Sequence, residues 1–543
     1  MNRCHVTFYP SNRRALVDEG ATVLDAIRAA ELPFDAPCGG DGTCGKCMVN
    51  ILSGGEIGLQ KACKTIVTGD MEISLLSAPE LYAQAMDETP FSPLRFDPPI
   101  EALGFIPDEP FLMAAFDIGT TSVVCYLLDG QTGKQLACAS QKNPQSIFGA
   151  DVLHRIGGAM RCGNAPLRKA ILYSMNSLLE AVCAETGISS RKILLSSVAG
   201  NTCMQHIFLD FPVSSLATPP YTPHTLEPIL LDAAVSGLAV DPRGKVFVFP
   251  NIGAFVGGDT VAGMLSTGFI SIGDPTLLID IGTNGEIVLA TKNRILACSA
   301  AAGPAFEGAH IRCGMRGGAG AVDHMRFDNG RLVYSTIDDK PAMGICGSGL
   351  VDAAAALLSA GMLDYSGRML RMEEMLSPIA IANVQRVSSV DGHPAFYLTK
   401  KSDASGRHPV FVTQRDIREL QLAKSAIAAG IELLMKTMDL TIHQIWHVYI
   451  AGAFGNYLDS GAACAIGLLP RELQSKIKIV GNAAGLGARL VLCDRSLWEN
   501  AGKLAAATEY VELSGHPAFQ DLFVKHLPFP RCTAVSNIFG RSV

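Results

Sequence analysis

The sequence has few charged residues and no excess of positive charge. Only 17% of its 543 residues are Asp, Glu, Lys or Arg, and the formal net charge is −7. Nucleic-acid-binding proteins need a basic surface, so nucleic acid is not expected as a partner. Hydrophobic residues make up 48% of the chain, which predicts a large core divided among more than one domain.

The sequence also lacks a long uninterrupted hydrophobic run. Its longest apolar tract, MGICGSGLVDAAAALLSAGML, contains Asp352 and several glycines. This composition predicts a buried helix with a glycine-rich start, and no membrane association is expected. The first residues alternate in polarity and soon include Arg13, Arg14 and Asp18, so they do not resemble a signal peptide. Scattered single cysteines predict a reducing, cytoplasmic location.

Two common nucleotide-binding motifs are missing. The sequence has no G-x-x-x-x-G-K-S/T, which excludes a P-loop protein. It also has no strand-linked G-x-G-x-x-G followed by an acidic residue, which disfavours a simple NAD(P)H reductase. A nucleotide site in this chain would need another design.

Four cysteines near the N-terminus form the most informative motif. Cys38, Cys44 and Cys47 lie in PCGGDGTCGKC, and Cys63 follows in KACKT. A C-x5-C-x2-C run with a fourth cysteine downstream is typical of the thiolate ligands of one [2Fe–2S] cluster. Glycines between them allow positive φ angles and a close approach of backbone amides to cluster sulfurs. A zinc site, which usually pairs two C-x2-C knuckles, and structural thiols are the weaker alternatives.

The residues around these cysteines predict a small α+β domain. HVTFYP, CMVNIL and MEISLL have the pattern of strands, and TVLDAIRAAEL has that of an amphipathic helix with Thr22 as its N-cap. Over residues 1–78 the chain resembles β-grasp ferredoxins. The five-residue gap between the first two cysteines is similar to that of the adrenodoxin-like branch.

An acidic, proline-rich segment follows at residues 79–111. It holds seven prolines and seven acidic residues but only one basic residue, Arg95. Proline fixes φ and removes a hydrogen-bond donor, so the segment is predicted to be an extended, semi-rigid linker. It is expected either to be a solvated spacer or to let the ferredoxin domain move between an electron donor and an acceptor.

One turn design occurs twice in the rest of the chain. LMAAFDIGTTSVVCYLLD contains Asp117, Gly119, Thr120 and Thr121, and TLLIDIGTNGEIVLA contains the second copy. In each, an apolar strand ends in Asp, and a glycine and hydroxyl or amide side chains follow. Such a hairpin can offer amides and a hydroxyl to phosphate oxygens while the Asp holds Mg²⁺ through water. The second copy supplies Asp280, Gly282, Thr283, Asn284 and Glu286.

The repeat resembles the ASKHA superfamily of acetate and sugar kinases, Hsc70 and actin. This resemblance implies a duplicated ribonuclease-H-like domain at residues 112–543, with halves near 112–270 and 271–543 and nucleotide in the cleft between them. WHVYIAGAFGNYLDS would be the adenosine loop, with Gly452 and Gly455 as close-approach positions. Ala451 departs from the usual Gly-Gly pair there.

Three further stretches are ambiguous. FPNIGAFVGGDTVAGML places Asp259 before an apolar helix pattern, where it would cap the helix or border an anion site. Glu307 lies in a glycine-rich loop that would line a cleft. Cys203 and His206 have C-x2-H spacing without a partner pair, so they are predicted to be core residues.

The order of these motifs resembles the reductive activators of corrinoid proteins, which accompany corrinoid methyltransferases and O-demethylases of anaerobic bacteria. The resemblance implies an enzyme that uses ATP to reduce an inactive Co(II) corrinoid protein to Co(I) in one-electron steps. Its implied cofactors are a [2Fe–2S] cluster, ATP and Mg²⁺. Its implied partners are the corrinoid protein and a low-potential electron donor, and the resemblance leaves a homodimer open.

The resemblance also implies roles for the repeated loops. Asp117 and Asp280 would flank Mg²⁺, the Thr and Asn side chains would contact phosphates, and Glu286 would position water. Two other functions stay open from the sequence alone. One is a metabolite kinase gated by the redox state of the cluster, and the other is a non-enzymatic protein that responds to nucleotide and redox state.

Overall fold

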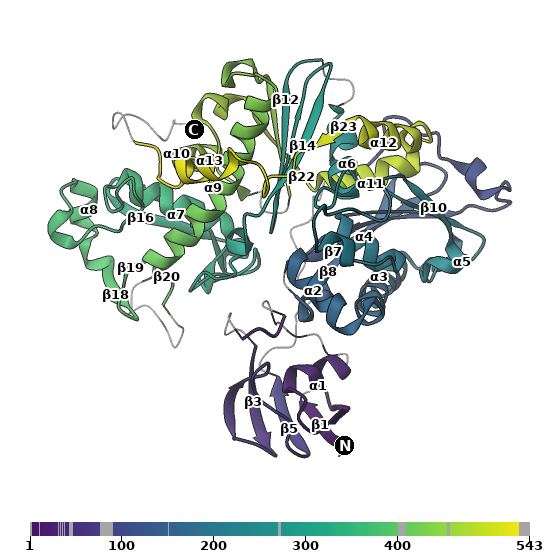
Figure 1. The fold of residues 1–543 in the computed structure, drawn as a ribbon, viewed down its shortest axis with the longest axis horizontal. Coiled ribbons are helices and arrows are strands. Elements are labelled where there is room, and N and C mark those ends of the chain that lie inside the picture. The colour runs from purple at the N-terminus through teal and green to yellow at the C-terminus, as the bar shows by residue number, and fades with distance from the viewer. Residues whose placement is uncertain are drawn as a thin grey trace. The chain divides into compact units, whose positions relative to one another are not determined.

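The computed structural model of the chain describes residues 3–9, 11–30, 32, 34, 36, 39–42, 47–75, 91–149, 151–269, 273–399, 409–452 and 457–531. These residues form two compact units (Figure 1). The described residues up to 262, together with 484–505, form the first unit; those of 263–483 and 506–531 form the second.

The N-terminal part of the first unit is a five-stranded sheet with one helix. Its strand order is β2-β1-β5-β3-β4, in which β1 and β5 are parallel and the other pairs antiparallel. A capping box between Thr22 and Asp25 begins α1, which confirms the predicted N-cap. The elements are β1 (Arg3–Tyr9), β2 (Arg13–Asp18), α1 (Val23–Ala29), β3 (Met48–Ser53), β4 (Gly58–Lys61) and β5 (Met71–Leu75).

The rest of the first unit is built on a six-stranded sheet of order β10-β11-β9-β6-β7-β8. Strands β11, β9 and β6 are parallel, while β6, β7 and β8 form an antiparallel meander. The long helix α3 packs against β7 and β8. The strands are β6 (Leu112–Ile118), β7 (Ser122–Asp129), β8 (Gln135–Lys142), β9 (Ile193–Gly200), β10 (Ile229–Asp232) and β11 (Lys245–Val248), and the helices are α2 (Val152–Cys162), α3 (Asn164–Thr186), α4 (Thr202–Leu209) and α5 (Ala233–Ser236).

The second unit repeats this arrangement. Its main sheet has the order β22-β21-β12-β13-β14-β23, again with three parallel strands followed by a meander. Helix α9 packs against β13 and β14 as α3 does in the first unit. Five strands of each sheet therefore share one duplicated topology, while β10 and β23 are added at opposite edges. The duplication confirms the predicted fold class. The elements are β12 (Thr276–Ile281), β13 (Gly285–Ala290), β14 (Ile295–Ala300), α9 (Gln414–Thr437), β21 (His447–Ala451), α10 (Ser460–Ala465), β22 (Ile477–Gly481), β23 (Thr508–Tyr510) and α13 (Phe519–His526).

An insertion between β14 and α9 has no counterpart in the first unit. It contains two small three-stranded sheets and the buried helix α7 (Gly347–Ser359), whose residues come from the longest apolar tract. No helix among the described residues has the length and apolarity needed to cross a membrane. The other elements are β15 (Ala321–Asp328), β16 (Arg331–Thr336), β17 (Gly344–Ile345), α8 (Pro378–Ala382), β18 (Val387–Val390), β19 (His393–Tyr397) and β20 (Phe411–Thr413).

Three helices contain the points where the chain passes between the units: α6 (Gly258–Ser266), α11 (Ala483–Cys493) and α12 (Ser496–Ala507). Residues 484–505 join the first unit although they follow the second hairpin in sequence. Aromatic stacking helps to attach these residues to the first unit, because the Trp498 ring lies on the Phe247 ring with centroids 4.8 Å apart. Gly487 packs so closely on Ala262 that a side chain there would collide with its backbone.

The described part of the linker is anchored to the first unit. Asp97 N donates to Cys493 O at 2.7 Å, and Arg495 N donates to Asp97 O at 2.8 Å. Phe91 O accepts from Gln135 N at 3.1 Å. Residues 91–111 therefore do not form the free spacer predicted from composition, and residues 79–90 lie outside the described residues.

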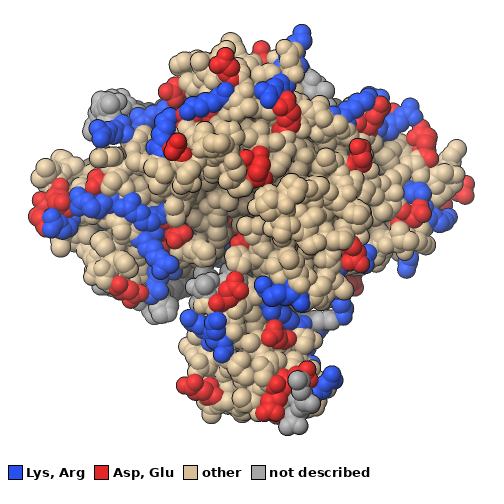
Figure 2. All heavy atoms as spheres, in the orientation of Figure 1, with Lys and Arg blue, Asp and Glu red and all other residues tan. Residues whose placement is uncertain are grey.

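The surface face drawn in Figure 2 carries basic and acidic side chains side by side. Lys and Arg are interspersed with Asp and Glu, and no large field of one sign covers the described residues on this face. Cys203 and His206 are buried, as predicted. His206 Nδ1 lies 2.8 Å from Pro212 O, and its Nε2 accepts from His224 N, so the buried ring is held by backbone groups of two exposed residues.

Candidate functional site

Two of the four motif cysteines lie together in the N-terminal domain. Cys47 directly precedes β3 and Cys63 follows β4; a bond from Ala62 N to Cys47 O at 2.7 Å joins the two segments. Both side chains are buried, with their Sγ atoms 3.2 Å apart. Two adjacent buried cysteine side chains fit two thiolate ligands of an iron–sulfur cluster. Cys38 and Cys44 lie outside the described residues.

The loop between the motif cysteines has the backbone that its glycines predict. Gly39, Gly40 and Gly42 have φ angles of +62°, +113° and +81°. Side chains other than glycine rarely adopt these angles, so the glycines allow the chain to turn tightly at this point. The amide-rich backbone this creates suits the electron-rich sulfurs of a cluster.

The first hairpin is a tight turn between β6 and β7. Gly119 N donates to Ser122 O at 2.9 Å and closes the turn, while Asp117 lies at the end of β6. Thr120 Oγ1 accepts from Asn201 Nδ2 at 2.9 Å. Asn201 is the N-cap of α4 and comes directly after β9, the parallel neighbour of β6. The carboxyl ends of two adjacent strands thus contribute to one polar group of residues, as in open α/β sheets that bind ligands.

Asp259 is close in the fold to the same strand ends. The backbone of Gly257 and Gly258 packs against Gly200 and Asn201, and Asp259 follows in the first turn of α6. Its side chain accepts from Thr260 N at 2.8 Å, and burial raises its pKa to about 6. Since α6 begins at Gly258, Asp259 is inside the helix and is not the cap that the sequence suggested.

The second hairpin has a turn one residue shorter than the first, and its neighbours are different. Gly282 N donates to Asn284 O at 2.9 Å between β12 and β13. Thr283 Oγ1 donates to Glu307 Oε1 at 2.6 Å, and Glu286 Oε1 accepts from Ser299 Oγ at 3.0 Å. The glycine-rich loop that carries Glu307 therefore touches the hairpin, and its place beside a cleft stays a prediction. A charged acceptor fixes the orientation of the Thr283 hydroxyl.

Gly452 approaches the second hairpin from the end of β21. Strand β21 is parallel to β12, with Ala451 paired to Asp280. Gly452 has φ +95°, and a Cβ atom there would lie 2.6 Å from both Asp280 Oδ1 and Ile281 O. Gly452 therefore packs closely on the aspartate of the hairpin, and its approach to adenosine stays a prediction. Gly455 lies outside the described residues.

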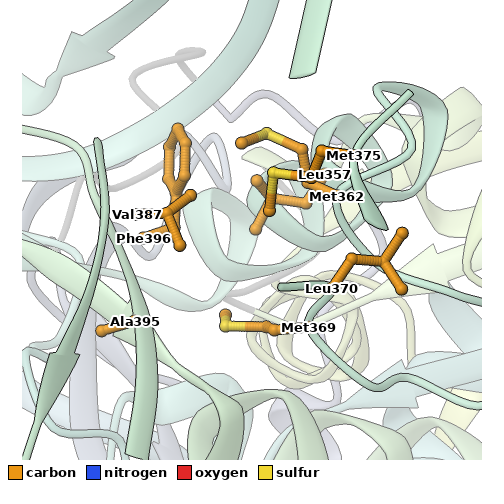
Figure 3. Close-up of a pocket in the computed structure, with 8 residues that line it drawn as sticks. All are labelled: Leu357, Met362, Met369, Leu370, Met375, Val387, Ala395 and Phe396. Atoms are coloured by element: carbon orange, nitrogen blue, oxygen red, sulfur yellow. The ribbon is translucent and has the colours of Figure 1, made fainter. Parts of the chain in front are cut away.

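A pocket in the insertion offers different chemistry. Leu357, Met362, Met369, Met375 and Phe396 are among its lining residues, and every side chain drawn in Figure 3 is apolar. Phosphate and Mg²⁺ need charged or polar partners, so this pocket is a gap in an apolar core and does not contribute to a nucleotide site.

Sequence reasoning missed Asn201 and did not connect Glu307 to a particular loop. Asn201 follows a buried strand and begins a helix, which is a recognisable pattern. Its contact with Thr120 depends on the pairing of β9 with β6, and Glu307 reaches Thr283 across 24 residues. The local pattern of polar and apolar residues does not predict either contact.

Comparisons with known families match nearly the whole chain. Residues 6–75 match the 2Fe-2S iron-sulfur cluster binding domain. Residues 112–271 match the RACo middle region, and residues 274–537 match the C-terminal domain of RACo, the ASKHA domain.

Individual proteins match over similar lengths. The corrinoid activation enzyme RamQ of Eubacterium limosum is 30% identical over 582 residues, covering 94% of this chain and 97% of that protein. A reductase of the Co(II) methylated amine-specific corrinoid protein of Methanosarcina barkeri is 22% identical over 451 residues, covering 76% of each. A solved reductive activator for corrinoid, iron-sulfur protein is 29% identical, with a TM-score of 0.71 and coverage of 97% and 98%. The chain therefore belongs to the family of reductive activators of corrinoid proteins.

Proposed function

We propose that this protein is an ATP-dependent reductase of a corrinoid protein, which it returns from Co(II) to Co(I) by one-electron transfer. The observation that carries the proposal is the combination of two parts in one chain. A domain with buried adjacent thiols precedes a duplicated core with two Asp-Ile-Gly-Thr hairpins, and the match to RamQ covers 94% of the chain.

The proposed cluster ligands are Cys38, Cys44, Cys47 and Cys63. When bound, a [2Fe–2S] cluster supplies one electron at a time. The buried positions of Cys47 and Cys63 limit water at two of the four ligands. The domain boundaries proposed for this carrier and its linker are 1–78 and 79–111, and the remaining chain, 112–543, forms the nucleotide-binding domain.

The proposed nucleotide-binding residues come from both hairpins. Thr120, Thr121, Thr283 and Asn284 would bind phosphates together with the turn amides after Gly119 and Gly282. Asp117 and Asp280 would hold Mg²⁺, with Glu286 positioning water. Gly452 and Gly455 would border the adenosine. Each turn is closed by its own backbone hydrogen bond.

ATP is needed in this proposal because the electron transfer is uphill. A plant-type cluster has a reduction potential of about −400 mV. The reduction potential of the Co(II)/Co(I) couple implied by the family is lower. A deficit of about 100 mV corresponds to about 2.3 kcal/mol for one electron. A nucleotide that binds two conformations unequally can supply this difference. We further propose a low-potential electron donor, a cytoplasmic location, no nucleic-acid or membrane partner, and a homodimer as one assembly.

A pair of variants separates the two parts. Cys47→Ala is expected to remove the cluster spectrum and Co(II) reduction while Mg-ATP binding is kept. Asp280→Ala is expected to keep the cluster spectrum and lose ATP-dependent reduction. Loss of the cluster spectrum in Asp280→Ala would contradict the division of labour. ATP consumption that requires a small metabolite instead of a corrinoid protein would favour a redox-gated kinase.

A further inference from the structure

The carbonyl groups of the first hairpin turn are all held by two buried residues. Asn143 donates from Nδ2 to Gly119 O at 2.8 Å and from its backbone N to Thr121 O at 2.9 Å. Arg155 Nη2 donates to Thr120 O. Both Asn143 and Arg155 are fully buried. A buried polar group that loses its partner costs about 1–3 kcal/mol, so the turn and these two residues are expected to move together.

Asn143 begins a short segment, residues 143–149, that we call the bridge segment. Asn143 Oδ1 caps the turn η2 (Pro144–Ile147) by accepting from Gln145 N at 3.0 Å. Arg155 holds the other end, since its Nε donates to Gly149 O at 2.9 Å. The bridge segment is therefore fixed at both ends by Asn143 and Arg155, the residues that hold the carbonyl groups of the first hairpin turn.

The ferredoxin domain binds the bridge segment through one arginine. Arg28 donates to Ile147 O from Nη2 at 2.8 Å and from Nε at 3.2 Å, and its guanidinium lies 5.6 Å from the centroid of the Phe148 ring. The same Nη2 donates to Gly39 O at 2.7 Å. Gly39 follows Cys38 in sequence, and a Cβ atom on Gly39 would lie 2.9 Å from Phe148 O.

These contacts form one continuous chain of bonds within the first unit. It runs from the loop of the cysteine motif, through Arg28 and the bridge segment, to the carbonyls of Gly119, Thr120 and Thr121. The buried apolar residues of the two domains also form a single cluster that includes Ile147 and Phe148. The bridge segment thus contacts the ferredoxin domain on one side and is bonded to the first hairpin turn on the other.

We propose that the bridge segment and Arg155 couple nucleotide binding at the first hairpin to docking of the ferredoxin domain through Arg28. This inference rests on the proposed function, because it requires the first hairpin to bind Mg-ATP. Both events order the same segment, so each needs less ordering once the other has occurred, and the coupling is positive. Bound nucleotide holds Arg28 and Gly39 of the ferredoxin domain against the bridge segment, and loss of nucleotide releases the ferredoxin domain. Arg28 and Arg155 act as positioning residues.

Hydrogen exchange on the cluster-loaded wild-type protein tests the coupling directly. Backbone amides at 24–30, 39–41 and 147–149 are measured with and without a non-hydrolysable Mg-ATP analogue. The proposal predicts exchange at least about fivefold slower with the analogue, the lower end of usual coupling strengths. Unchanged exchange at saturating analogue would overturn it.

Coupling between two binding events is reciprocal, so docking of the ferredoxin domain must also strengthen nucleotide binding. The affinity for the same analogue, measured by calorimetry, is therefore a second readout. Arg28→Ala is expected to weaken binding at least about fivefold, although Arg28 contacts neither hairpin in any described bond. Arg28→Lys is expected to recover part of the loss. Arg3→Ala is the matched control, since Arg3 is exposed and pairs with Asp18 at 3.5 Å in the same domain. It should bind like wild type.

Two further results keep the outcomes distinct. If Arg28→Ala disturbs the cluster spectrum, Phe148→Ala tests the same contact without altering the cysteine loop, and it should weaken binding equally. Wild-type affinity in both variants would overturn the coupling while leaving the proposed function intact. Failure of the wild-type protein to bind the analogue would overturn the proposed function and the coupling with it.

Discussion

The two hairpins share a sequence design but differ in turn length and in surroundings: Ile118 pairs with Val123 in the first, and Ile281 pairs with Gly285 in the second. In the first, neutral Asn201 contacts Thr120, and buried Asn143 and Arg155 hold the turn carbonyls. In the second, the carboxylate of Glu307 holds Thr283, and Gly452 packs against Asp280. The duplicated strand order places a hairpin at the same point of both sheets, while the turn length and the neighbouring segments differ. The first hairpin is thus bonded to residues that reach the ferredoxin domain, and the second is bordered by a carboxyl side chain.

The largest expected effect comes from removing the aspartate of the second hairpin. Asp280→Ala should lower ATP-dependent reduction at least about 1000-fold, because the metal charge that stabilises the transferring phosphate would lose its anchor. The rate of Co(I) formation measures this. Asp117→Ala should also be inactive, but only Asp117→Ala should change amide exchange at residues 147–149. Equal exchange in the two variants would remove the distinction between the hairpins.

Gly452→Ala tests the close approach that is particular to the second hairpin. The new Cβ would meet Asp280 Oδ1 and Ile281 O at 2.6 Å in a backbone with φ +95°. Strain of about 3 kcal/mol corresponds to about a 100-fold loss of nucleotide affinity or rate. Gly330→Ala is the control, because Gly330 has φ +77° and open space around it. If both variants lose activity equally, contact with Asp280 is not the cause.

A smaller effect is expected from the partners of the two threonines. Glu307→Gln keeps an acceptor for Thr283 but removes its charge, and charge-assisted bonds contribute about 2 kcal/mol, or about 30-fold in rate. Asn201→Ala removes a neutral bond to Thr120 worth about 1 kcal/mol, or about fivefold. Steady-state ATP hydrolysis in the presence of a corrinoid protein measures both. A larger loss in Asn201→Ala than in Glu307→Gln would reverse the assigned roles.

A pH dependence is expected for the stability of the first unit, and it does not involve the hairpin side chains. Burial raises the pKa of Asp259 from 3.8 to about 6, so the folded protein favours its neutral form. Its contribution to stability is therefore present at low pH and is lost as pH rises through about 6. Between pH 5 and 7.5, wild type should lose about 1.5 kcal/mol relative to Asp259→Asn. Urea unfolding at the two pH values measures the difference, and a constant difference would contradict the buried ionisation.

Local sequence patterns were sufficient for the elements and turns of this protein. The Thr22 cap, the strands that flank DIGTT and DIGTNGE, and the positive φ angles of Gly39, Gly40 and Gly42 follow from residue type and spacing. These features depend on neighbours within a few residues, where propensity and sterics dominate.

Contacts made across the sheet could not be read in the same way. The Asn201–Thr120 and Glu307–Thr283 bonds join segments 81 and 24 residues apart. The anchoring of residues 91–111 was also missed, because proline and acid content describes the linker's own stiffness and not the groups on the first unit that bind it. The link from Arg28 to Ile147 spans 119 residues and depends on the folded first unit.

The most direct test of the central claim is a visible spectrum of a Co(II) corrinoid protein mixed anaerobically with this protein, its cluster reduced beforehand. Spectra are recorded with and without Mg-ATP. Growth of the Co(I) band only with Mg-ATP is the predicted result, because the two parts of the chain would then act as one ATP-driven reductase. Equal growth without nucleotide, or no Co(I) with any cognate corrinoid protein, would contradict the account.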